Sequence, residues 1–304
     1  MRLVTYQRQK TAALGAVLDG RIVDLTLALH AVWGRLEPGV LTPHPSTAAM
    51  IAFLAAGPAA LEAARAHVAE LQRDWHAEAH PRLEASVLLA PIPRPGKIVA
   101  IGRNYADHAA ETGVKPFERP RIIAKLPSSV TGPGAVVRRP EGITKLDYEI
   151  ELGVVIGQRV NRMPSASALD AVAGYTILND VSAREFQFDV SPAQTTFAKS
   201  MDGFCPMGPW LTTRDEIPDP HALALKLWVN GELLQDGNTH DMIFDIPRLI
   251  EYISRYMTLE PGDVIATGTP AGVGAFRTPP RWLQPGDRLR LEVSGIGVLE
   301  HSIG

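Results

Sequence analysis

Two glutamates in the segment DYEIELGVVIG, residues 147–157, have the spacing that places both on one face of a β-strand. Side chains alternate between the faces of a strand, so Glu149 and Glu151 project to one side and the apolar residues beside them to the other. Two carboxylates roughly 7 Å apart on one face repel each other unless a neighbour neutralises them. A face turned to solvent makes the charges harmless, whereas a face that lines a cleft favours a bound cation. The spacing leaves both interpretations open.

A third carboxylate, Asp180, follows the apolar run in YTILNDVSARE, where a buried strand would end. Together with Glu149 and Glu151 it makes an all-oxygen set, with no thiolate and no clear imidazole ligand beside it. Such a set suits Mg²⁺, Mn²⁺ or Ca²⁺ better than Zn²⁺. These three residues are the candidate metal ligands.

His108 and Glu111 lie three residues apart in GRNYADHAAETG, residues 102–113. Residues at this spacing are neighbours on a helical turn, so the two side chains can touch. A carboxylate beside an imidazole fixes its tautomer and raises its basicity, which suits a general base. An exposed helix surface with incidental charges explains the same spacing.

Two further features have both a functional and an ordinary interpretation. Lys199 stands between Phe197 and Phe204, where it either extends its charge to solvent or is a positioned cation. The segment TGTPAGVG, residues 267–274, is a glycine-rich loop without the Gly-Lys-Ser/Thr ending of a phosphate-binding P-loop. Its backbone N–H groups can hold a carboxylate, although loops of this kind are also ordinary turns.

Short strands joined by turns must position these side chains. Asp19-Gly20 and Asn230-Gly231 predict tight hairpin turns, and Pro-Gly at 261–262 and 285–286 predicts turns that open strands. Asp245 is the predicted N-cap of the last helix. Apolar runs predict strands at 2–6, 97–101, 121–126, 148–156, 175–179, 224–230, 263–266 and 288–293, and helices at 47–56, 59–72, 104–112, 165–172 and 246–257.

Composition agrees with a turn-rich, folded protein. The 304 residues include 26 glycines and 25 prolines, about 17% of the chain against about 12% in average usage. A hydrophobic fraction of 45% and a net charge of −3 exclude a disordered chain and disfavour nucleic acid as a partner. We expect an α+β fold, with a β-rich domain at 91–304 after a small α/β domain at 1–90, because residues 80–95 are rich in proline.

The single cysteine, Cys205, fits a reducing, cytoplasmic location. The N-terminus MRLVTYQRQK has no apolar core of a secretory signal, and no apolar run is long enough to span a membrane. We therefore expect no membrane partner.

Five phrases in order give the chain a resemblance to the fumarylacetoacetate hydrolase family. They are KIVAIGRNYADHAAE, DYEIELGVVIG, GYTILNDVSARE, AKSMDGFCPMGPW and GDVIATGTPAGVG, and they extend from about Lys97 to the C-terminus. The resemblance implies a β-rich roll with flanking helices, in a homodimer. It also implies Mg²⁺ or Mn²⁺ held by Glu149, Glu151 and Asp180.

The resemblance assigns further roles. His108 and Glu111 match the pair that activates water, and Lys199 matches an active-site lysine. The residues that match substrate contacts are Arg184, Gln187, Gly268 and Thr269. Some members have a fourth carboxylate ligand seven residues before the histidine, where this chain has Ile101. We therefore expect a three-carboxylate site completed by water or substrate.

The implied reaction is cleavage of a C–C bond in a 2,4-dioxo acid of acylpyruvate or fumarylpyruvate type. His108 activates water, Lys199 stabilises the developing oxyanion, and the metal spreads the charge of the released pyruvate enolate. An oxaloacetate decarboxylase, or an isomerase or decarboxylase of 2-hydroxyhepta-2,4-diene-1,7-dioate from aromatic catabolism, would use the same enolate chemistry. A non-catalytic domain that binds a metal or ligand ranks third.

Overall fold

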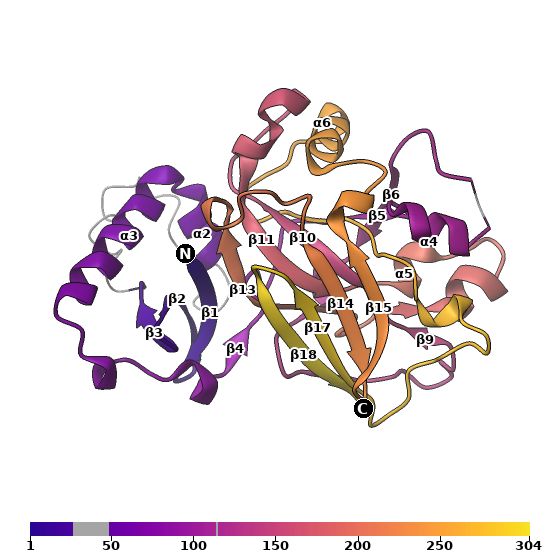
Figure 1. The fold of residues 1–304 in the computed structure, drawn as a ribbon, viewed down its shortest axis with the longest axis horizontal. Coiled ribbons are helices and arrows are strands. Elements are labelled where there is room, and N and C mark those ends of the chain that lie inside the picture. Colours follow the sequence, from indigo (N-terminus) through magenta and orange to yellow (C-terminus); the bar gives the residue numbers. More distant parts are fainter. Residues whose placement is uncertain (27–48, 114) are drawn as a thin grey trace.

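A mixed sheet runs through both the N-terminal part and the larger β-rich part of the chain (Figure 1). The computed structural model describes residues 1–26, 49–113 and 115–304. In spatial order the sheet contains β3 (Arg21–Asp24), β2 (Thr11–Leu18), β1 (Arg2–Arg8), β13 (Cys205–Thr213), β11 (Val172–Asn179), β10 (Ile150–Ile156), β16 (Val264–Ala266), β5 (Ile98–Gly102) and β6 (Arg121–Lys125), with β4 (Leu88–Leu89) beside β1 and β7 (Val130–Thr131) beside β13.

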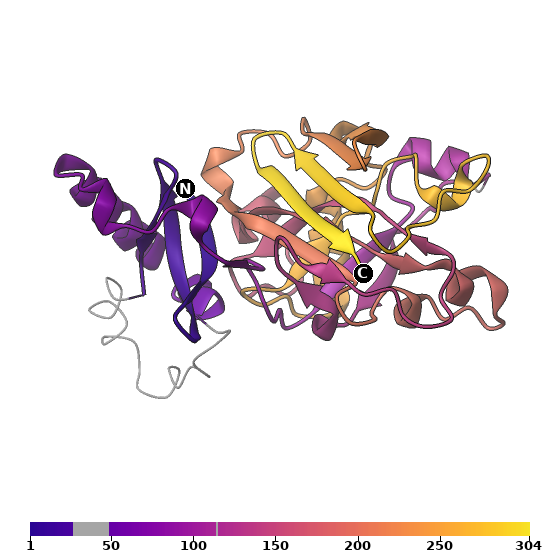
Figure 2. The same cartoon turned by 90° about the horizontal axis from the view of Figure 1, so that it is seen from below.

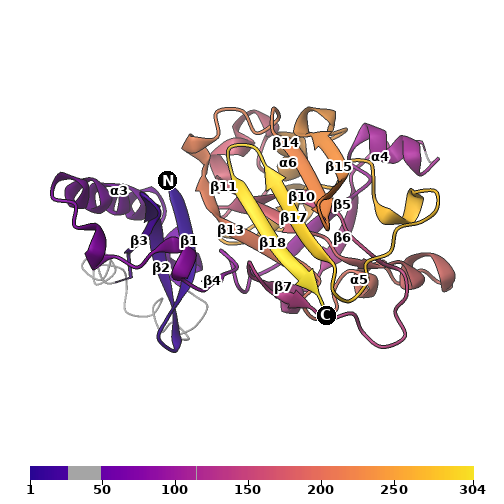
Figure 3. The ribbon, with the colours of Figure 1, turned by 60° about the horizontal axis from the view of Figure 1, so that its bottom comes forward.

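A second sheet packs against the middle of the first. Its strands are β15 (Glu232–Asn238), β14 (Ala224–Val229), β17 (Arg288–Val293), β18 (Gly297–Ile303) and β8 (Val136–Val137). β14, β17 and β18 contact β10, β11 and β13, and Figure 3 shows β17 and β18 lying across that face. A short pair, β9 (Leu146–Asp147) and β12 (Ser182–Ala183), lies apart from both sheets. The architecture is the predicted β-rich α+β fold.

The apolar residues of the two sheets form one large core. In β10 the side chains of Ile150, Leu152 and Val154 belong to that core, while Val155 belongs to a second core on the opposite face of the sheet. This is the alternation that strand geometry requires. It turns Glu151 away from the second sheet.

The helices are short and flank the sheets. They are α2 (Ala49–Ala55), α3 (Pro58–Arg73), α4 (Ala106–Glu111), α5 (Thr195–Ala198) and α6 (Ile246–Tyr256). Asp245 caps α6 as predicted, accepting the backbone N–H of Arg248 at 2.9 Å. The first predicted helix, at 47–56, corresponds to α2, and its predicted start at residues 47–48 lies outside the described residues.

The helix predicted at 165–172 is a short 3-10 helix. Residues Ser165–Ala171 form 3-10 turns, in which the N–H of Ser167 bonds the carbonyl of Pro164 at 3.1 Å. The segment has room for only seven residues before β11 begins at Val172. Short pieces of this kind commonly close i to i+3 bonds instead of α-helical ones.

The turn residues confirm most of the predicted connections. Asp19 and Gly20 have φ values of 45° and 69°, and Asn230 and Gly231 have 53° and 85°, which the tight hairpin turn requires. The strand predicted at 148–156 begins only at Ile150. Glu149 therefore lies on the approach to the strand, where its backbone N–H bonds the side chain of Asn179 at 2.9 Å.

The N-terminal part joins the larger part edge to edge. β1 pairs antiparallel with β13, with Arg2 opposite Thr212 and Leu3 opposite Leu211 (Figures 1 and 2). The predicted boundary near residue 90 falls between β4 and β5. Two segments more than 200 residues apart in sequence thus share one sheet.

Within the described residues, no single helix is long and apolar enough to cross a membrane. α2 and α3 meet that test only when taken together, and they are bent by 113° at their junction.

Candidate active site

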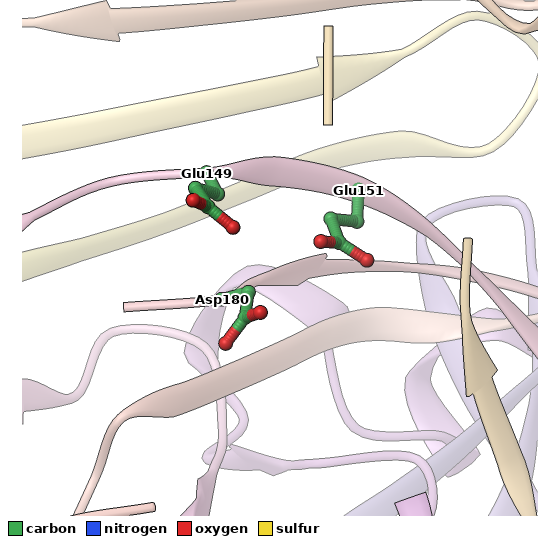
Figure 4. A group of neighbouring side chains, drawn as sticks. All are labelled: Glu149, Glu151 and Asp180. Carbon is green, nitrogen blue, oxygen red and sulfur yellow. The ribbon is translucent and has the colours of Figure 1, made fainter. Parts of the chain in front are cut away.

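The three predicted metal ligands lie together in the folded chain. Glu151 extends from β10, Glu149 from the residues just before it, and Asp180 from the end of β11 (Figure 4). One carboxylate oxygen of each lies within 4.8 Å of the others. All three side chains are buried, with Glu151 and Asp180 at most 2% exposed. The interpretation of this strand face as a solvated surface is therefore wrong.

Cations neutralise two of these three carboxylates. The Nζ of Lys199 donates to Glu149 at 2.8 Å and to Asp180 at 2.6 Å. Arg184 Nη2 binds Glu149 at 2.6 Å, and Lys125 Nζ binds Asp180 at 2.8 Å. Lys199 is 4% exposed, so it is a positioned cation and does not extend to solvent.

The third carboxylate has no such cation. Across the described residues no lysine or arginine forms an ion pair with Glu151, whose Oε2 accepts only the backbone N–H of Gly268 at 2.9 Å. Burial, Asp180 and Glu149 raise the pKa of Glu151 well above 4.5. Burial also opposes ionisation of Glu149, but Lys199 and Arg184 outweigh it and lower its pKa to about 2.

This donor set fits a divalent cation. These three carboxylates and Asp147, which also pairs with Arg184, are all buried and carry one more negative charge than Lys199, Arg184 and Lys125 neutralise. An unpaired buried carboxylate is costly. Oxygen ligands of this kind suit Mg²⁺, Mn²⁺ or Ca²⁺. Ile101, at the position of the fourth family carboxylate, is buried in the wall beside the cluster, which within the described chain has three acidic members.

His108 and Glu111 form the contact that their spacing predicts. On α4, Nδ1 of His108 lies 2.6 Å from Oε1 of Glu111. A carboxylate accepts hydrogen bonds, so Nδ1 carries a proton, and in the neutral imidazole Nε2 then has a free electron pair. His108 is only 6% exposed and lines the same cavity as the carboxylates, which excludes an incidental surface pair.

The glycine-rich loop holds carboxylates, but they are the protein's own. The N–H of Gly268 binds Glu151, that of Gly272 binds Glu111 at 3.0 Å, and that of Gly274 binds Asp147 at 2.7 Å. This loop therefore orients both Glu151, a candidate metal ligand, and Glu111, the partner of His108. Thr269 lines the cavity, and its hydroxyl accepts the side-chain amide of Gln235 at 2.7 Å.

Two further predicted substrate contacts, Arg184 and Gln187, are joined by a hydrogen bond. Arg184 Nη1 donates to Gln187 at 2.8 Å, and its Nε donates to Asp147 at 2.9 Å. Arg184 and Gln187 both line the cavity, whereas Gly268 contributes its N–H behind it.

The cavity above these groups is small, about 180 Å³. Pockets that take drug-sized ligands measure about 300–1,000 Å³, so this one suits a small metabolite. The charged and polar residues in its wall are Arg103, His108, Thr112, Arg121, Glu149, Glu151, Asp180, Arg184, Gln187, Thr195, Lys199 and Thr269.

Comparisons with known proteins agree with this arrangement. Residues 97–304 match the family described as fumarylacetoacetate (FAA) hydrolase C-terminal. The chain belongs to the fumarylacetoacetate hydrolase family. Its relatives include the mitochondrial oxaloacetate tautomerase FAHD2B of Bos taurus, 38% identical over the whole of this chain and 91% of that protein.

Solved structures of the family resemble this fold over its full length. A putative HpcE protein from Mycobacterium smegmatis aligns with a TM-score of 0.82 and 35% identity, covering all of this chain and 99% of that one. A maleylpyruvate hydrolase from Sphingobium sp. SYK-6, solved with manganese(II) and pyruvate, aligns with a TM-score of 0.78 and 31% identity, covering all of this chain and 98% of that one.

Sequence reasoning missed three further residues of this site. Asp147 is fully buried and anchors Arg184, and Lys125 is buried beside Asp180 and the backbone carbonyl of Lys199. Signals for both existed: Asp147 has the same alternation as Glu149 and Glu151, and Lys125 interrupts the apolar run of β6. Ser182, which accepts a hydrogen bond from Lys199 at 2.8 Å, carried no such signal.

Proposed function

We propose that this protein is a divalent-metal-dependent enzyme that interconverts the keto and enol forms of a small 2-oxo acid, with oxaloacetate as the first candidate substrate. The observation that carries the proposal is the buried triad of Glu149, Glu151 and Asp180 opening into a 180 Å³ cavity beside His108. Similarity over the full chain to oxaloacetate tautomerases supports the choice of substrate.

Enolisation requires a base near the carbon next to the 2-oxo group and positive charge near the oxygen. The triad would hold Mg²⁺ or Mn²⁺, which supplies Lewis acidity and stabilises negative charge on a nearby oxygen. Nε2 of His108 takes the proton from C3, and Glu111 stabilises the imidazolium that forms. The imidazolium then returns this proton to the enolate oxygen, which forms the enol and restores the neutral imidazole.

The cationic side chains orient the substrate. Lys199 and Arg184 are held rigidly by their carboxylate partners, so they present fixed positive charge at the cavity wall. Preorganised charge of this kind stabilises a developing oxyanion without a reorganisation cost at the moment of reaction.

Hydrolysis of a C–C bond in 2,4-dioxo acids is the second candidate function, which the sequence analysis ranked first. The His108–Glu111 pair favours it, because Nε2 of a histidine oriented in this way can also take a proton from water. The similarity to a maleylpyruvate hydrolase adds support. The tautomerase ranks above it because the oxaloacetate tautomerases are more similar in sequence, 38% against 31% identity.

A two-substrate assay separates the candidates. Protein treated with a chelator and then supplied with Mg²⁺ or Mn²⁺ is mixed with enol-oxaloacetate, whose ultraviolet absorbance falls as it ketonises. In parallel, pyruvate release is measured from acylpyruvates and from oxaloacetate. Metal-dependent ketonisation without pyruvate release supports the tautomerase, and pyruvate release from acylpyruvates supports the hydrolase. Pyruvate release from oxaloacetate identifies a decarboxylase, and no turnover of any of these acids overturns the proposal.

We further propose that the protein acts as a homodimer in the cytoplasm. The size distribution in solution and the location of the tagged protein test these two points.

A further inference from the structure

Two arginines at one side of the cavity have no role in the chemistry described above. Arg103 follows the end of β5, and Arg121 opens the neighbouring strand β6. Gly102 lies opposite Arg121 in the strand register, and a methyl group added at Gly102 would come within 3.2 Å of the Arg121 Cδ. The missing side chain at Gly102 thus leaves space in which the stem of Arg121 crosses to the cavity.

The same aromatic ring holds both guanidinium groups. The Cζ of Arg103 lies 5.8 Å from the centroid of Phe117, and that of Arg121 lies 5.9 Å from it. A cation over an aromatic ring is stabilised by the ring's negative face while its N–H groups stay available. The ring therefore gathers two like charges at one place on the cavity wall.

Neither guanidinium is matched by an acid. In the parts of the chain that the structure describes, no carboxylate forms an ion pair with Arg103 or Arg121, in contrast to Arg184 and Lys199. Burial and the charge of Arg121 lower the pKa of Arg103, as expected where positive charge lacks a counterion. Arg103 also has a positive φ of 55°, a strained conformation for a non-glycine residue. Such strain is concentrated at ligand sites.

We infer that Arg103 and Arg121 bind a second carboxylate of the substrate, the one remote from the 2-oxo acid group, and so select dicarboxylates over monocarboxylates. This inference rests on the proposed function, whose 2-oxo acid end lies at Glu149, Glu151 and Asp180. The planar, multiply donating guanidinium is suited to a carboxylate. The small cavity limits such a substrate to a short 2-oxo diacid.

Charge balance across the cavity supports this assignment. Glu149, Glu151, Asp180 and Asp147 carry four negative charges, against five positive charges on Lys199, Arg184, Lys125 and a divalent cation. The one positive charge left over at this end suits the carboxylate of the 2-oxo acid group, and Arg103 and Arg121 add further positive charge to the wall. A monocarboxylate places its one charge at the metal end and leaves both arginines unpaired. A dicarboxylate neutralises both ends at once.

The test measures binding with two ligands that differ only at the remote end. Malate and 2-hydroxybutanoate share the 2-hydroxy acid group, but malate has a carboxylate where 2-hydroxybutanoate has a methyl group, and neither can enolise. Calorimetric titration with Mn²⁺ present gives both affinities for the wild type, Arg103→Gln, Arg121→Gln and the control Arg119→Gln. Arg119 is exposed on the same segment and does not line the cavity.

We expect the wild type and Arg119→Gln to bind malate about tenfold or more tightly than 2-hydroxybutanoate, the effect of one charge-assisted contact. Arg103→Gln and Arg121→Gln should each reduce that ratio by about tenfold while leaving the affinity for 2-hydroxybutanoate unchanged. The inference is overturned if all four proteins have the same ratio of malate to 2-hydroxybutanoate affinity. It is also overturned if the arginine variants lose affinity for both ligands by the same factor.

Activity separates this inference from the proposed function. If the wild type enolises oxaloacetate, the KM of Arg121→Gln should rise about tenfold with little change in kcat, because the contact is remote from the reacting carbon. If the wild type enolises no 2-oxo acid but the malate ratio still depends on the arginines, the proposed function fails and the dicarboxylate site stands. If the wild type enolises oxaloacetate but the ratio of malate to 2-hydroxybutanoate affinity is the same in all four proteins, the proposed function stands and the dicarboxylate site fails.

Discussion

Replacing Glu151 with glutamine should stabilise the metal-free protein while weakening metal binding. Glu151 is the one carboxylate of the cluster without a lysine or arginine ion pair in the described chain. Glutamine has nearly the same shape and keeps an oxygen for the N–H of Gly268. The substitution therefore removes a buried charge and leaves the packing intact.

The cluster geometry sets the size of the effect. Two unit charges 4.8 Å apart, the limit within which these oxygens lie, repel by about 3.5 kcal/mol at an effective dielectric constant of about 20. Glu149 and Asp180 each repel Glu151, and Lys199 offsets about one of these terms. A net repulsion of about 3.5 kcal/mol remains, equivalent to a melting temperature higher by about 5 °C for a chain of this length.

The sign of the pH dependence follows from the raised pKa of Glu151. A carboxyl group whose pKa is higher in the folded state than its ordinary 4.5 stabilises the fold at low pH, and that stability is lost as pH rises through the folded value. The wild type in chelator should lose stability as pH rises above 4.5, and Glu151→Gln should not share this loss. The two proteins should melt together near pH 4.5 and diverge towards pH 8.

Thermal melts in chelator from pH 4.5 to 8, followed by circular dichroism, measure this difference. Asp180→Asn is the matched control, because it removes the same charge but breaks ion pairs with Lys199 and Lys125. It should lower stability by about 3–5 kcal/mol, the usual cost of breaking a buried pair. With Mn²⁺ added, only the wild type should gain stability, by about 2.7 kcal/mol of unfolding free energy at a metal concentration of 100 Kd.

The reasoning is refuted if Glu151→Gln in chelator melts at or below the wild type at pH 8. A difference that stays constant from pH 4.5 to 8 would also refute it, because the gain would then not come from removing an ionised carboxylate.

Three further outcomes test other parts of the structure. His108→Asn should lower kcat by about 100-fold or more, within the range for general acid–base catalysis, and unchanged turnover of every 2-oxo acid would remove His108 from the mechanism. Leu3→Ala should lower the free energy of unfolding in urea by about 2–5 kcal/mol, because Leu3 is fully buried where β1 meets β13, and a loss below about 1 kcal/mol would contradict that packing. Cys205 should resist thiol reagents at pH 8 until the protein unfolds, because burial raises the pKa of its thiol to about 12, and rapid labelling of native protein would show that it is accessible.

Local features of the fold were predictable because local forces set them. The turns at Asp19-Gly20 and Asn230-Gly231 need positive φ values that few residue pairs adopt, and the structure has both turns. Asp245 caps its helix by accepting a hydrogen bond from the backbone N–H of Arg248, only three residues further along the chain. The helix predicted at 165–172 is present as a 3-10 helix over Ser165–Ala171, a segment of only seven residues before β11 begins.

The pairing of strands far apart in the sequence could not be predicted from local sequence patterns. β1 and β13 are each ordinary strands in sequence, and nothing in either indicates the other as partner. Such pairing depends on the total burial reached by the whole fold, which no window of sequence contains. The same limit hid Ser182, which reaches the site from β12 and accepts a hydrogen bond from Lys199.

The sequence by itself determined which chemical groups this protein has and which of them share a face or a helical turn. Alternation along a strand placed Glu149 and Glu151 together, and spacing on a turn placed His108 against Glu111. These are consequences of covalent geometry and backbone period. They were sufficient to indicate the family and its type of site.

Only the tertiary structure decided whether this strand face and this helical turn are exposed to solvent or buried against each other. It buries the strand face, brings Asp180 and Lys199 to it, and leaves Glu151 as the carboxylate without a paired cation among the described residues. Burial and charge pairing depend on side chains tens to hundreds of residues apart, because electrostatic energies are set by distance in space and by the exclusion of water.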